Sequence, residues 1–366
     1  MKKKYLHVIT NFEQIGGAEK MLIRAINASD ENTQHTIVSL MCISDLMKSQ
    51  LLKNVVFHSL NVNNVLTLLL SAFKLRKILK TSRADVVYSW MYHANFIAAL
   101  SKLLMLVSPP LIWGVIRSLD DLKGESVSSK LAIYMGKILR FVPDKVVYCA
   151  SRAMKQHIAF GYSVQRKSIY IPNGYEFLEL TPRKFKKETL VLGAARRFHD
   201  AKDYRTLFKA VAPILNKYEG IRLKVAGRDI NNANVEITNY IDEFSIAPAQ
   251  IDLLGQLNDM PSFYNSVDFF ILSSKTEGFP NVLAEAAGYG CITFSTDAGD
   301  AGLIVNDEKR LVKIGGALAI SKLLECYINK PSKELNMIAN KSAYYIRETY
   351  SINSISKRLL SVGRNQ

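Results

Sequence analysis

One stretch of the chain joins an apolar run to a helical segment through a tight turn, and it decides the fold prediction. It reads Ser273-Ser274-Lys275-Thr276-Glu277-Gly278-Phe279-Pro280-Asn281-Val282-Leu283-Ala284-Glu285. The apolar run before it predicts a strand, and Gly278 and Pro280 predict the turn. The helix that follows opens with free backbone N–H groups and the positive end of its dipole. Such a helix start is an anion site, and a diphosphate suits it.

Two carboxylates flank the helix start. Glu277 lies in the turn, and Glu285 lies eight positions later on the helix. They could hold separate hydroxyl-bearing parts of one ligand. The plain alternative is a surface loop followed by one glutamate on a helix face.

Short β-rich runs alternate with longer periodic segments on both sides of this stretch. In the first half, strands are predicted at 5–10, 35–41, 55–60, 85–90, 111–116 and 145–150, with helices that include 18–28, 65–81, 94–105 and 128–141. In the second half, strands are predicted at 190–195, 222–226, 251–254, 267–272 and 291–295, with helices at 204–218, 235–244 and 282–289. This alternation indicates βαβ units and parallel sheets.

A polar, basic linker interrupts the alternation. Pro172-Asn173-Gly174 begins it, and a charged run ends it near residue 188. We therefore predict two doubly wound α/β domains, at 1–176 and 187–348. Because such sheets bind ligands at the carboxyl ends of their strands, the cleft between the domains is the expected site.

Composition narrows the class of protein. The chain has 366 residues, 48% of them hydrophobic and 22% charged, which excludes disordered and coiled-coil classes. Its four cysteines form no Cys-x-x-Cys pair, so neither a disulfide framework nor a thiolate zinc site is indicated, and a reducing cytoplasm fits. The start turns polar before an apolar signal core forms, and the apolar run at 96–116 is broken by Pro109-Pro110. We expect a cytoplasmic chain and interpret 96–116 as a buried helix, turn and strand.

The charge is strongly basic and unevenly distributed. The net charge is +16, and residues 1–180 hold 23 Lys and Arg against 12 Asp and Glu. Such a field attracts nucleic acid, anionic lipid or a phosphorylated ligand. Composition alone leaves the three open.

Two further loops follow predicted strands. Cationic side chains follow the strand at 190–195, in the run from Arg196-Arg197 to Lys202, where they suit phosphate oxygens or form a solvated loop. Gly16-Gly17 follows the first strand and lets the backbone approach a ligand. The chain has no Gly-x-Gly-x-x-Gly and no P-loop, so dinucleotide and P-loop nucleotide binding lose their main support.

Several short motifs occur in the order found in one enzyme family. They are Gly16-Gly17-Ala18-Glu19, Trp90-Met91-Tyr92-His93-Ala94, Trp113-Gly114-Val115-Ile116-Arg117, Ile171-Pro172-Asn173-Gly174, Arg197 with Lys202, the Glu277 and Glu285 pair, and Thr296-Asp297-Ala298-Gly299-Asp300. With them the chain resembles, over nearly its whole length, the retaining glycosyltransferases of family 4. The resemblance implies the GT-B fold, with two Rossmann-like domains facing across a cleft and a last helix, at 350–366, that crosses back to the first domain.

The resemblance also implies residue roles. Arg197 and Lys202 would bind the donor diphosphate and stabilise the leaving nucleotide. Glu285 would hold the ribose and Glu277 the transferred sugar. The implied catalytic set is Arg197, Lys202, Glu277 and His93, and the implied donor-binding set adds Gly16, Gly17, Arg117, Asn173, Gly278, Phe279, Pro280, Asn281, Val282 and Glu285.

The chain departs from the family pattern at two places. Arg117 stands where many members have a histidine, and the stretch after Thr296-Asp297 is short, because 303–307 runs almost directly into a helix. No Asp-x-Asp triplet occurs. Since cations and a helix start can stabilise the departing charge, we expect no metal and no cofactor.

A basic, apolar helix is predicted at 65–81. It starts with a run of leucines and carries Lys74, Arg76, Lys77 and Lys80 toward its end. It could lie on anionic lipid or hold a phosphorylated carrier, or it could be a core helix whose cations complement its dipole. Lys130, Lys137 and Arg140 on a second apolar helix favour the membrane surface.

The expected function is transfer of a sugar from a nucleotide diphosphate donor to a glycan or polyprenyl-diphosphate-linked acceptor. The family resemblance favours UDP as the nucleotide. The setting would be capsule or lipopolysaccharide assembly, with the protein peripheral on the inner face of the plasma membrane. No residue stands out as a nucleophile, so retention by same-face displacement is preferred to a covalent intermediate. A nucleotide-sugar epimerase or hydrolase is the alternative on the same fold. A nucleic-acid binder lacks any reader motif.

Overall fold

The chain forms two compact units in the computed structural model. The structure describes residues 2–120, 122, 124, 126–178, 183–186 and 189–363. Unit 1 comprises Met1–Gly174 with Tyr350–Gln366, and unit 2 comprises Tyr175–Thr349. The chain therefore passes between the units twice, once before Tyr175 and once after Thr349.

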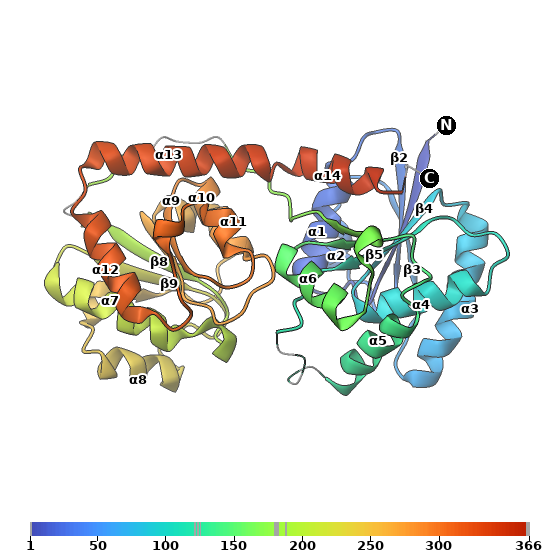
Figure 1. Cartoon of the computed structure of the whole chain (residues 1–366), viewed down its shortest axis with the longest axis horizontal. Coiled ribbons are helices and arrows are strands. Elements are labelled where there is room, and N and C mark those ends of the chain that lie inside the picture. Colours follow the sequence, from blue (N-terminus) through green and yellow to red (C-terminus); the bar gives the residue numbers. More distant parts are fainter. Residues whose placement is uncertain are drawn as a thin grey trace. The chain divides into compact units, whose positions relative to one another are not determined.

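Unit 1 contains a seven-stranded parallel sheet with helices on both faces (Figure 1). Its strand order is β3-β2-β1-β4-β5-β6-β7. The strands are β1 (Lys3–Ile9), β2 (Thr33–Ser39), β3 (Val55–Ser59), β4 (Val86–Trp90), β5 (Leu111–Val115), β6 (Lys145–Tyr148) and β7 (Ser168–Tyr170). The helices are α1 (Gly17–Asn27), α2 (Asp45–Ser49), α3 (Val65–Ser82), α4 (Tyr92–Leu103), α5 (Val127–Ile138), α6 (Ser151–Phe160) and α14 (Ile352–Ser361).

The helices of unit 1 pack in two layers. α4 contacts both α3 and α5, and α14 packs against α1. Two tyrosine hydroxyls of the sheet donate to carbonyls of α14, Tyr5 to Leu360 at 3.3 Å and Tyr88 to Leu359 at 2.6 Å. The last helix is thus part of unit 1, on the face that α1 covers.

Unit 2 contains a six-stranded parallel sheet in the order β10-β9-β8-β11-β12-β13. Its strands are β8 (Val191–Ala195), β9 (Arg222–Ala226), β10 (Ile251–Leu253), β11 (Phe269–Leu272), β12 (Ile292–Thr296) and β13 (Leu311–Val312). Its helices are α7 (Tyr204–Lys217), α8 (Val235–Glu243), α9 (Met260–Asn265), α10 (Asn281–Gly288), α11 (Ala301–Val305), α12 (Ala317–Ile328) and α13 (Ser332–Thr349). All five strand pairings of this sheet are parallel, as the alternation predicted.

The prediction of two parallel-sheet α/β domains is confirmed. The apolar run at 96–116 forms the end of α4, a turn and β5, as predicted. Among the described residues, no helix is both long and apolar enough to cross a membrane. The edge strands β7 and β13 were not predicted, because they have only three and two residues. The stretch at 303–307 contains the end of α11 (Ala301–Val305), and a 3-10 turn and β13 separate it from the next helix, α12.

Candidate active site

The strand order reverses once in each sheet. In unit 1 the reversal lies between β1 and β4, and in unit 2 between β8 and β11. Parallel sheets bind ligands beside the carboxyl ends of the strands at such a reversal. The segments that follow these four strands, loops and the first residues of α1 and α4, carry Gly16-Gly17, His93, the Arg196–Lys202 run and Glu277. The fold therefore puts most of the predicted residues at the two reversal points.

Glu277 is the centre of a buried ionic cluster in unit 2. Its Oε1 lies 2.7 Å from Arg196 Nη2 and 3.0 Å from Lys202 Nζ. The Ser274 hydroxyl donates a third contact to the same oxygen at 2.6 Å. The side chains of Arg196, Lys202 and Glu277 are 17%, 16% and 7% exposed. Loops from two neighbouring strands thus meet on one carboxylate oxygen.

Two cations surround one anion, so the cluster keeps one excess positive charge. Burial pushes the pKa of Glu277 up, but the charges of Arg196 and Lys202 outweigh it, and the pKa lies below its ordinary value. Burial lowers the pKa of Lys202, and Arg196 lowers it further against the opposing charge of Glu277. The excess charge in a mostly buried place suits an anionic ligand.

Arg196, which the sequence analysis did not choose, is the arginine of this cluster. Arg196 Nη2 forms an ion pair with Glu277, but the contact does not have the geometry of a hydrogen bond. In the described structure, Nε and Nη2 of Arg196 are therefore buried without a hydrogen-bond partner. Arg197, the predicted residue, is exposed. Because the two arginines are adjacent where β8 ends, their side chains leave in different directions, and composition could not distinguish them. The role predicted for Arg197 remains a prediction.

Backbone contacts hold both loops in place. Lys275 N–H donates to the Ala201 carbonyl at 2.9 Å, and the Ser273 hydroxyl donates to the Lys202 carbonyl at 2.9 Å. At the turn itself, Asp300 N–H donates to the Gly278 carbonyl at 3.0 Å. Gly299 has φ of +62°, and a Cβ there would lie 2.3 Å from the Gly278 oxygen, so only glycine fits. The cluster is therefore built on a braced backbone.

Glu285 occupies a separate position on α10. It is 8% exposed, and its Oε2 accepts a hydrogen bond from the Tyr264 hydroxyl at 3.0 Å. Burial raises the pKa of Tyr264, and the charge of Glu285 raises it further, so the phenol stays a donor. No side chain caps the start of α10 in the described structure. Nearby, Phe279 is buried and stacks on Tyr175, and the Tyr175 hydroxyl bonds Asn281.

The unit 1 candidates gather around the loop that opens α1. A Cβ on Gly16 would lie 2.5 Å from Glu19 Oε2, and one on Gly17 would lie 3.6 Å from Ile116. The pKa of Glu19 is raised, because burial disfavours its charged form. Three weaker effects lower this pKa: hydrogen bonds from the backbone of Glu19 and of Gly16, and the charge of Arg117. The structure thus brings Gly16, Gly17 and Arg117 together through Glu19, which the sequence analysis gave no role. The buried Asn173 lines a small hollow together with Ile116.

His93 is the second residue of α4 and is half-buried. The residue that precedes this helix, Met91, has φ of +73° and ψ of 167°. A side chain in this region is strained, and such strain is concentrated at functional sites. Tyr92 is anchored by a hydrogen bond between its hydroxyl and His157 Nε2 at 3.0 Å. A fixed, strained turn therefore sets the position of His93.

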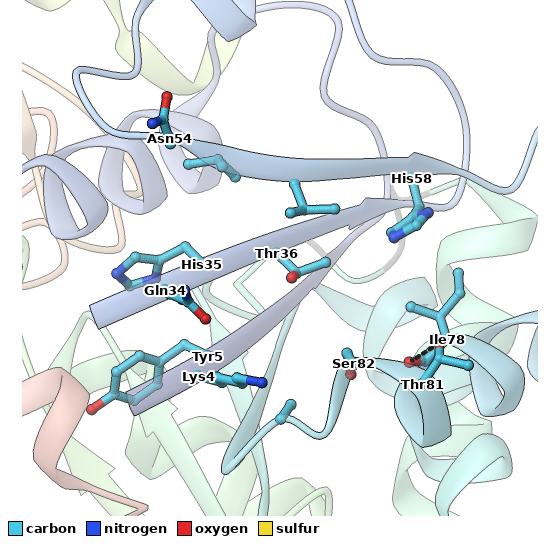
Figure 2. Close-up of a pocket in the computed structure, with 13 residues that line it drawn as sticks. Lys4, Tyr5, Gln34, His35, Thr36, Asn54, His58, Ile78, Thr81 and Ser82 are labelled. Atoms are coloured by element: carbon cyan, nitrogen blue, oxygen red, sulfur yellow. Dashed lines mark hydrogen bonds between the residues drawn. The ribbon is translucent and has the colours of Figure 1, made fainter. Parts of the chain in front are cut away.

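A larger hollow in unit 1 contains none of the predicted residues. It has a volume of about 480 Å³ and lies over β1 to β3 beside the end of α3 (Figure 2). Figure 2 shows Lys4, Thr36 and His58 on the side of the strands that faces Ile78 and Thr81.

Among the described residues, no group of three or more His, Cys, Asp or Glu side chains is arranged to hold a metal ion. The expectation of a metal-free reaction stays a prediction.

The basic residues predicted to meet lipid or acceptor lie on α3. Lys74, Lys77 and Lys80 are exposed, and Arg76 is half-buried. α3 packs against the rest of unit 1 through Ala72, Leu75 and Leu79, whereas several of its other apolar side chains are exposed. Neither alternative of the sequence analysis describes it fully, because the same helix has a core stripe and an exposed apolar stripe.

Comparison with known proteins shows what the chain is similar to. Residues 189–326 match the family described as glycosyl transferases group 1. The chain is 25% identical over 243 residues to the capsular polysaccharide biosynthesis glycosyltransferase CapH of Staphylococcus aureus. The aligned segment covers 62% of this chain and 63% of that protein. The chain thus spans less than two thirds of that relative's length.

Two other similarities extend over more of the chain. One is to GalNAc-alpha-(1->4)-GalNAc-alpha-(1->3)-diNAcBac-PP-undecaprenol alpha-1,4-N-acetyl-D-galactosaminyltransferase of Campylobacter jejuni, 25% identical over 341 residues and covering 89% of both chains. The other is to the structure of Anabaena Alr3699/HepE in complex with UDP and glucose, with a TM-score of 0.78, 15% identity, and coverage of 99% of this chain and 100% of that chain.

These findings show the fold of the chain and the family that its second unit matches. The two parallel-sheet units have the GT-B fold. The segment from just before β8 into α12 matches the family of glycosyl transferases group 1. It contains the Arg196, Lys202 and Glu277 cluster in full.

Proposed function

We propose that the protein moves a sugar from a nucleotide diphosphate donor, a UDP-sugar, to a lipid-linked or polysaccharide acceptor with retention of configuration, as a family 4 enzyme. The observation that carries this proposal is the cluster of Arg196, Lys202 and Glu277, with its excess positive charge beside the start of α10. A diphosphate is the ligand that such a site suits. The UDP-bound Anabaena structure has the same fold, which supports the choice of nucleotide.

The chemistry can proceed without a metal. The bond between the anomeric carbon and the diphosphate oxygen breaks, and the acceptor oxygen bonds to the same face of that carbon. The acceptor proton passes to the departing phosphate oxygen. Arg196 and Lys202 stabilise the negative charge that develops on the leaving group, and Glu277 keeps both cations in place. Glu285 would hold the ribose hydroxyls, because its carboxylate is fixed by Tyr264.

The acceptor and location are inferred from the relatives. The Campylobacter relative acts on an undecaprenyl-diphosphate-linked glycan, and the Staphylococcus relative is a capsule enzyme. We propose an acceptor of this kind, a cytoplasmic protein, and a peripheral position at the inner face of the plasma membrane. The basic helix α3 supports that position.

Thermal shift with UDP, GDP, ADP and their sugar conjugates tests the donor site, because a ligand that binds only the folded state stabilises it. We expect UDP or UDP-sugars to raise the melting temperature, and Arg196→Ala and Lys202→Ala to abolish the rise. Lys275→Ala is the matched control, since this lysine is exposed on the loop that carries Glu277. A wild-type chain that no nucleotide stabilises would contradict the proposed donor class.

The reaction itself is tested on the purified chain with donor and an isolated lipid-linked glycan. We expect transfer to persist in excess chelator and NMR to show retained configuration. Loss of transfer in chelator with recovery in magnesium would reject the metal-free mechanism. Release of free sugar at full rate without acceptor would favour a hydrolase instead.

A further inference from the structure

The start of α10 has no side-chain cap in the part of the chain that the structure describes. A capping side chain would accept a hydrogen bond from an N–H group of the first turn, and a diphosphate bound there needs the same groups. Such a cap also holds the first turn of a helix in place. A helix start that leaves its N–H groups to a ligand therefore needs another support.

Tyr175 supports the start of α10 from outside the helix. It is 2% exposed, and its hydroxyl donates a hydrogen bond to Asn281 Oδ1 at 2.5 Å. Its ring stacks on Phe279, with the ring centroids 6.4 Å apart and the planes inclined by 25°. Asn281 is the first residue of α10, and Phe279 lies in the turn before it. One side chain thus holds residues on both sides of the helix start.

Phe177 contacts the other end of the same helix. Gly288 is the last residue of α10, and a Cβ on it would lie 2.1 Å from the Phe177 ring, so a larger residue would displace the ring. The ring also meets Tyr289 edge to face, with centroids 5.6 Å apart, and it packs beside Tyr175 at 5.9 Å. The segment 175–177 therefore contacts both ends of α10.

Arg347 keeps this segment against the helix. Its guanidinium carbon lies 4.9 Å from the centroid of the Phe177 ring, and its Nε donates to the Gly288 carbonyl at 2.8 Å. Arg347 belongs to α13, which packs against α10 (Figure 1). An aromatic face attracts a cation, and so does the carboxyl end of a helix dipole. Both attractions keep Phe177 at the end of α10.

We propose that Tyr175 is a positioning residue for the donor diphosphate. Its hydroxyl, acting through Asn281, holds the first turn of α10 in the geometry that binds the diphosphate. Phe177 and Arg347 fix the other end of the helix. The donor groups of a binding site must be held to within about 0.5 Å, so the loss of one support weakens binding. This inference rests on the proposed function, because it needs a diphosphate at the start of α10.

Affinities for UDP and for uridine test the proposal, because only UDP carries the diphosphate. Calorimetry measures the affinity for UDP, and competition with UDP measures that for uridine. Tyr175→Phe keeps the ring and removes the hydroxyl, so UDP should bind about fivefold more weakly, as expected for the loss of one hydrogen bond. The affinity for uridine should not change. In steady-state transfer the donor KM should rise by the same factor, and the acceptor KM should stay the same.

Tyr88→Phe is the matched control. Tyr88 is 1% exposed in unit 1, and its hydroxyl donates to the Leu359 carbonyl at 2.6 Å. The control therefore loses the same group from an equally buried place. Both variants should lower the melting temperature, but only Tyr175→Phe should weaken UDP binding. This pattern separates a positioning role from a contribution to stability.

A double-mutant cycle tests whether the hydroxyl acts through Asn281. Asn281→Ala removes the side chain that accepts the hydrogen bond from Tyr175. In that background, Tyr175→Phe should not weaken UDP binding further, because two changes in one interaction are not additive.

Phe177→Leu tests the other end of α10. Leucine keeps an apolar side chain beside Gly288 but offers no ring to the Arg347 cation. The affinity for UDP should fall about threefold, and the affinity for uridine should not change.

Three results would overturn the inference. They are wild-type affinity for UDP in Tyr175→Phe or Phe177→Leu, a parallel loss of uridine binding, and full additivity of Tyr175→Phe with Asn281→Ala. A wild-type chain that binds no UDP would overturn the proposed donor site and this inference with it. If UDP binds the wild type and Tyr175→Phe equally well, the donor site stands and only the role of Tyr175 fails.

Discussion

The sheet of unit 2 keeps charged groups buried at its strand reversal, whereas the sheet of unit 1 buries neutral polar rings. In unit 2, Glu277 pairs with Arg196 and Lys202, and all three are largely buried. In unit 1, His7 and His35 share a hydrogen bond of 3.0 Å, and His157 bonds Tyr92. Buried charges are held in place by their partners and are ready for an ionic ligand. Buried neutral imidazoles instead make stability depend on pH.

The two units also differ at their surfaces. Unit 1 exposes apolar side chains and lysines on α3 and α5. In unit 2, the exposed apolar side chains Val235, Leu318 and Met337 lie on three different helices, α8, α12 and α13. The distinctive feature of unit 2 is thus its buried ionic cluster, and that of unit 1 is the set of exposed side chains on α3 and α5.

The largest expected effect concerns the cluster of unit 2. Arg196→Ala should lower kcat/KM for sugar transfer at least about a hundredfold, because it removes a preorganised cation from the developing charge. Arg197→Ala should lower kcat/KM less than Arg196→Ala if Arg196 is the more important cation, and it tests the role predicted for Arg197 from the sequence. Initial rates of transfer measure both. Equal losses for the two variants would show that the buried position of Arg196 carries no special role.

The second expected effect is a loss of stability in unit 1 in acid. Burial lowers the pKa of both His35 and His157 to about 4, and the pKa of His7 also falls, so the fold favours the neutral rings. Their contribution is complete above the unfolded value of 6.5 and is lost as pH falls toward 4. Each of His35 and His157 should contribute ~3 kcal/mol to the free energy of unfolding at neutral pH, and this contribution is absent below about pH 4.

Unit 2 should lose stability only at a lower pH than unit 1. Its histidine, His199, is exposed, and the pKa of Glu277 is lowered, so the contribution of Glu277 is lost only below about 4.5. Hydrogen exchange between pH 7 and 4.5 should therefore show unit 1 strands losing protection before unit 2 strands. Simultaneous loss in both sheets would contradict this difference.

The smallest expected effect tests the strained turn before His93. Met91→Gly should be more stable than Met91→Ala by about 1 kcal/mol, because φ of +73° suits glycine and strains alanine. Both variants lose the same packing, so the pair isolates the backbone. Urea denaturation measures the difference. If alanine is the more stable of the two, the turn does not store strain.

Sequence reasoning placed the strands and helices well where they are long. The alternation of apolar runs marked β8 and β11 and also α3, because periodicity reports which residues share a face. Turn chemistry marked the loop of Glu277, and Lys202 was chosen from the family resemblance, because its charge alone left a solvated loop open. The edge strands β7 and β13 were missed because such short runs carry no periodic signal.

What the sequence by itself determined is the α/β alternation and the residue types at the carboxyl ends of the strands. The tertiary structure decided which of two adjacent arginines meets Glu277, because this depends on the direction in which the chain leaves β8. It also decided that the apolar stripe of α5 faces outward. Periodicity identifies such a stripe, but only packing against α4 determines which side of the helix remains in contact with water.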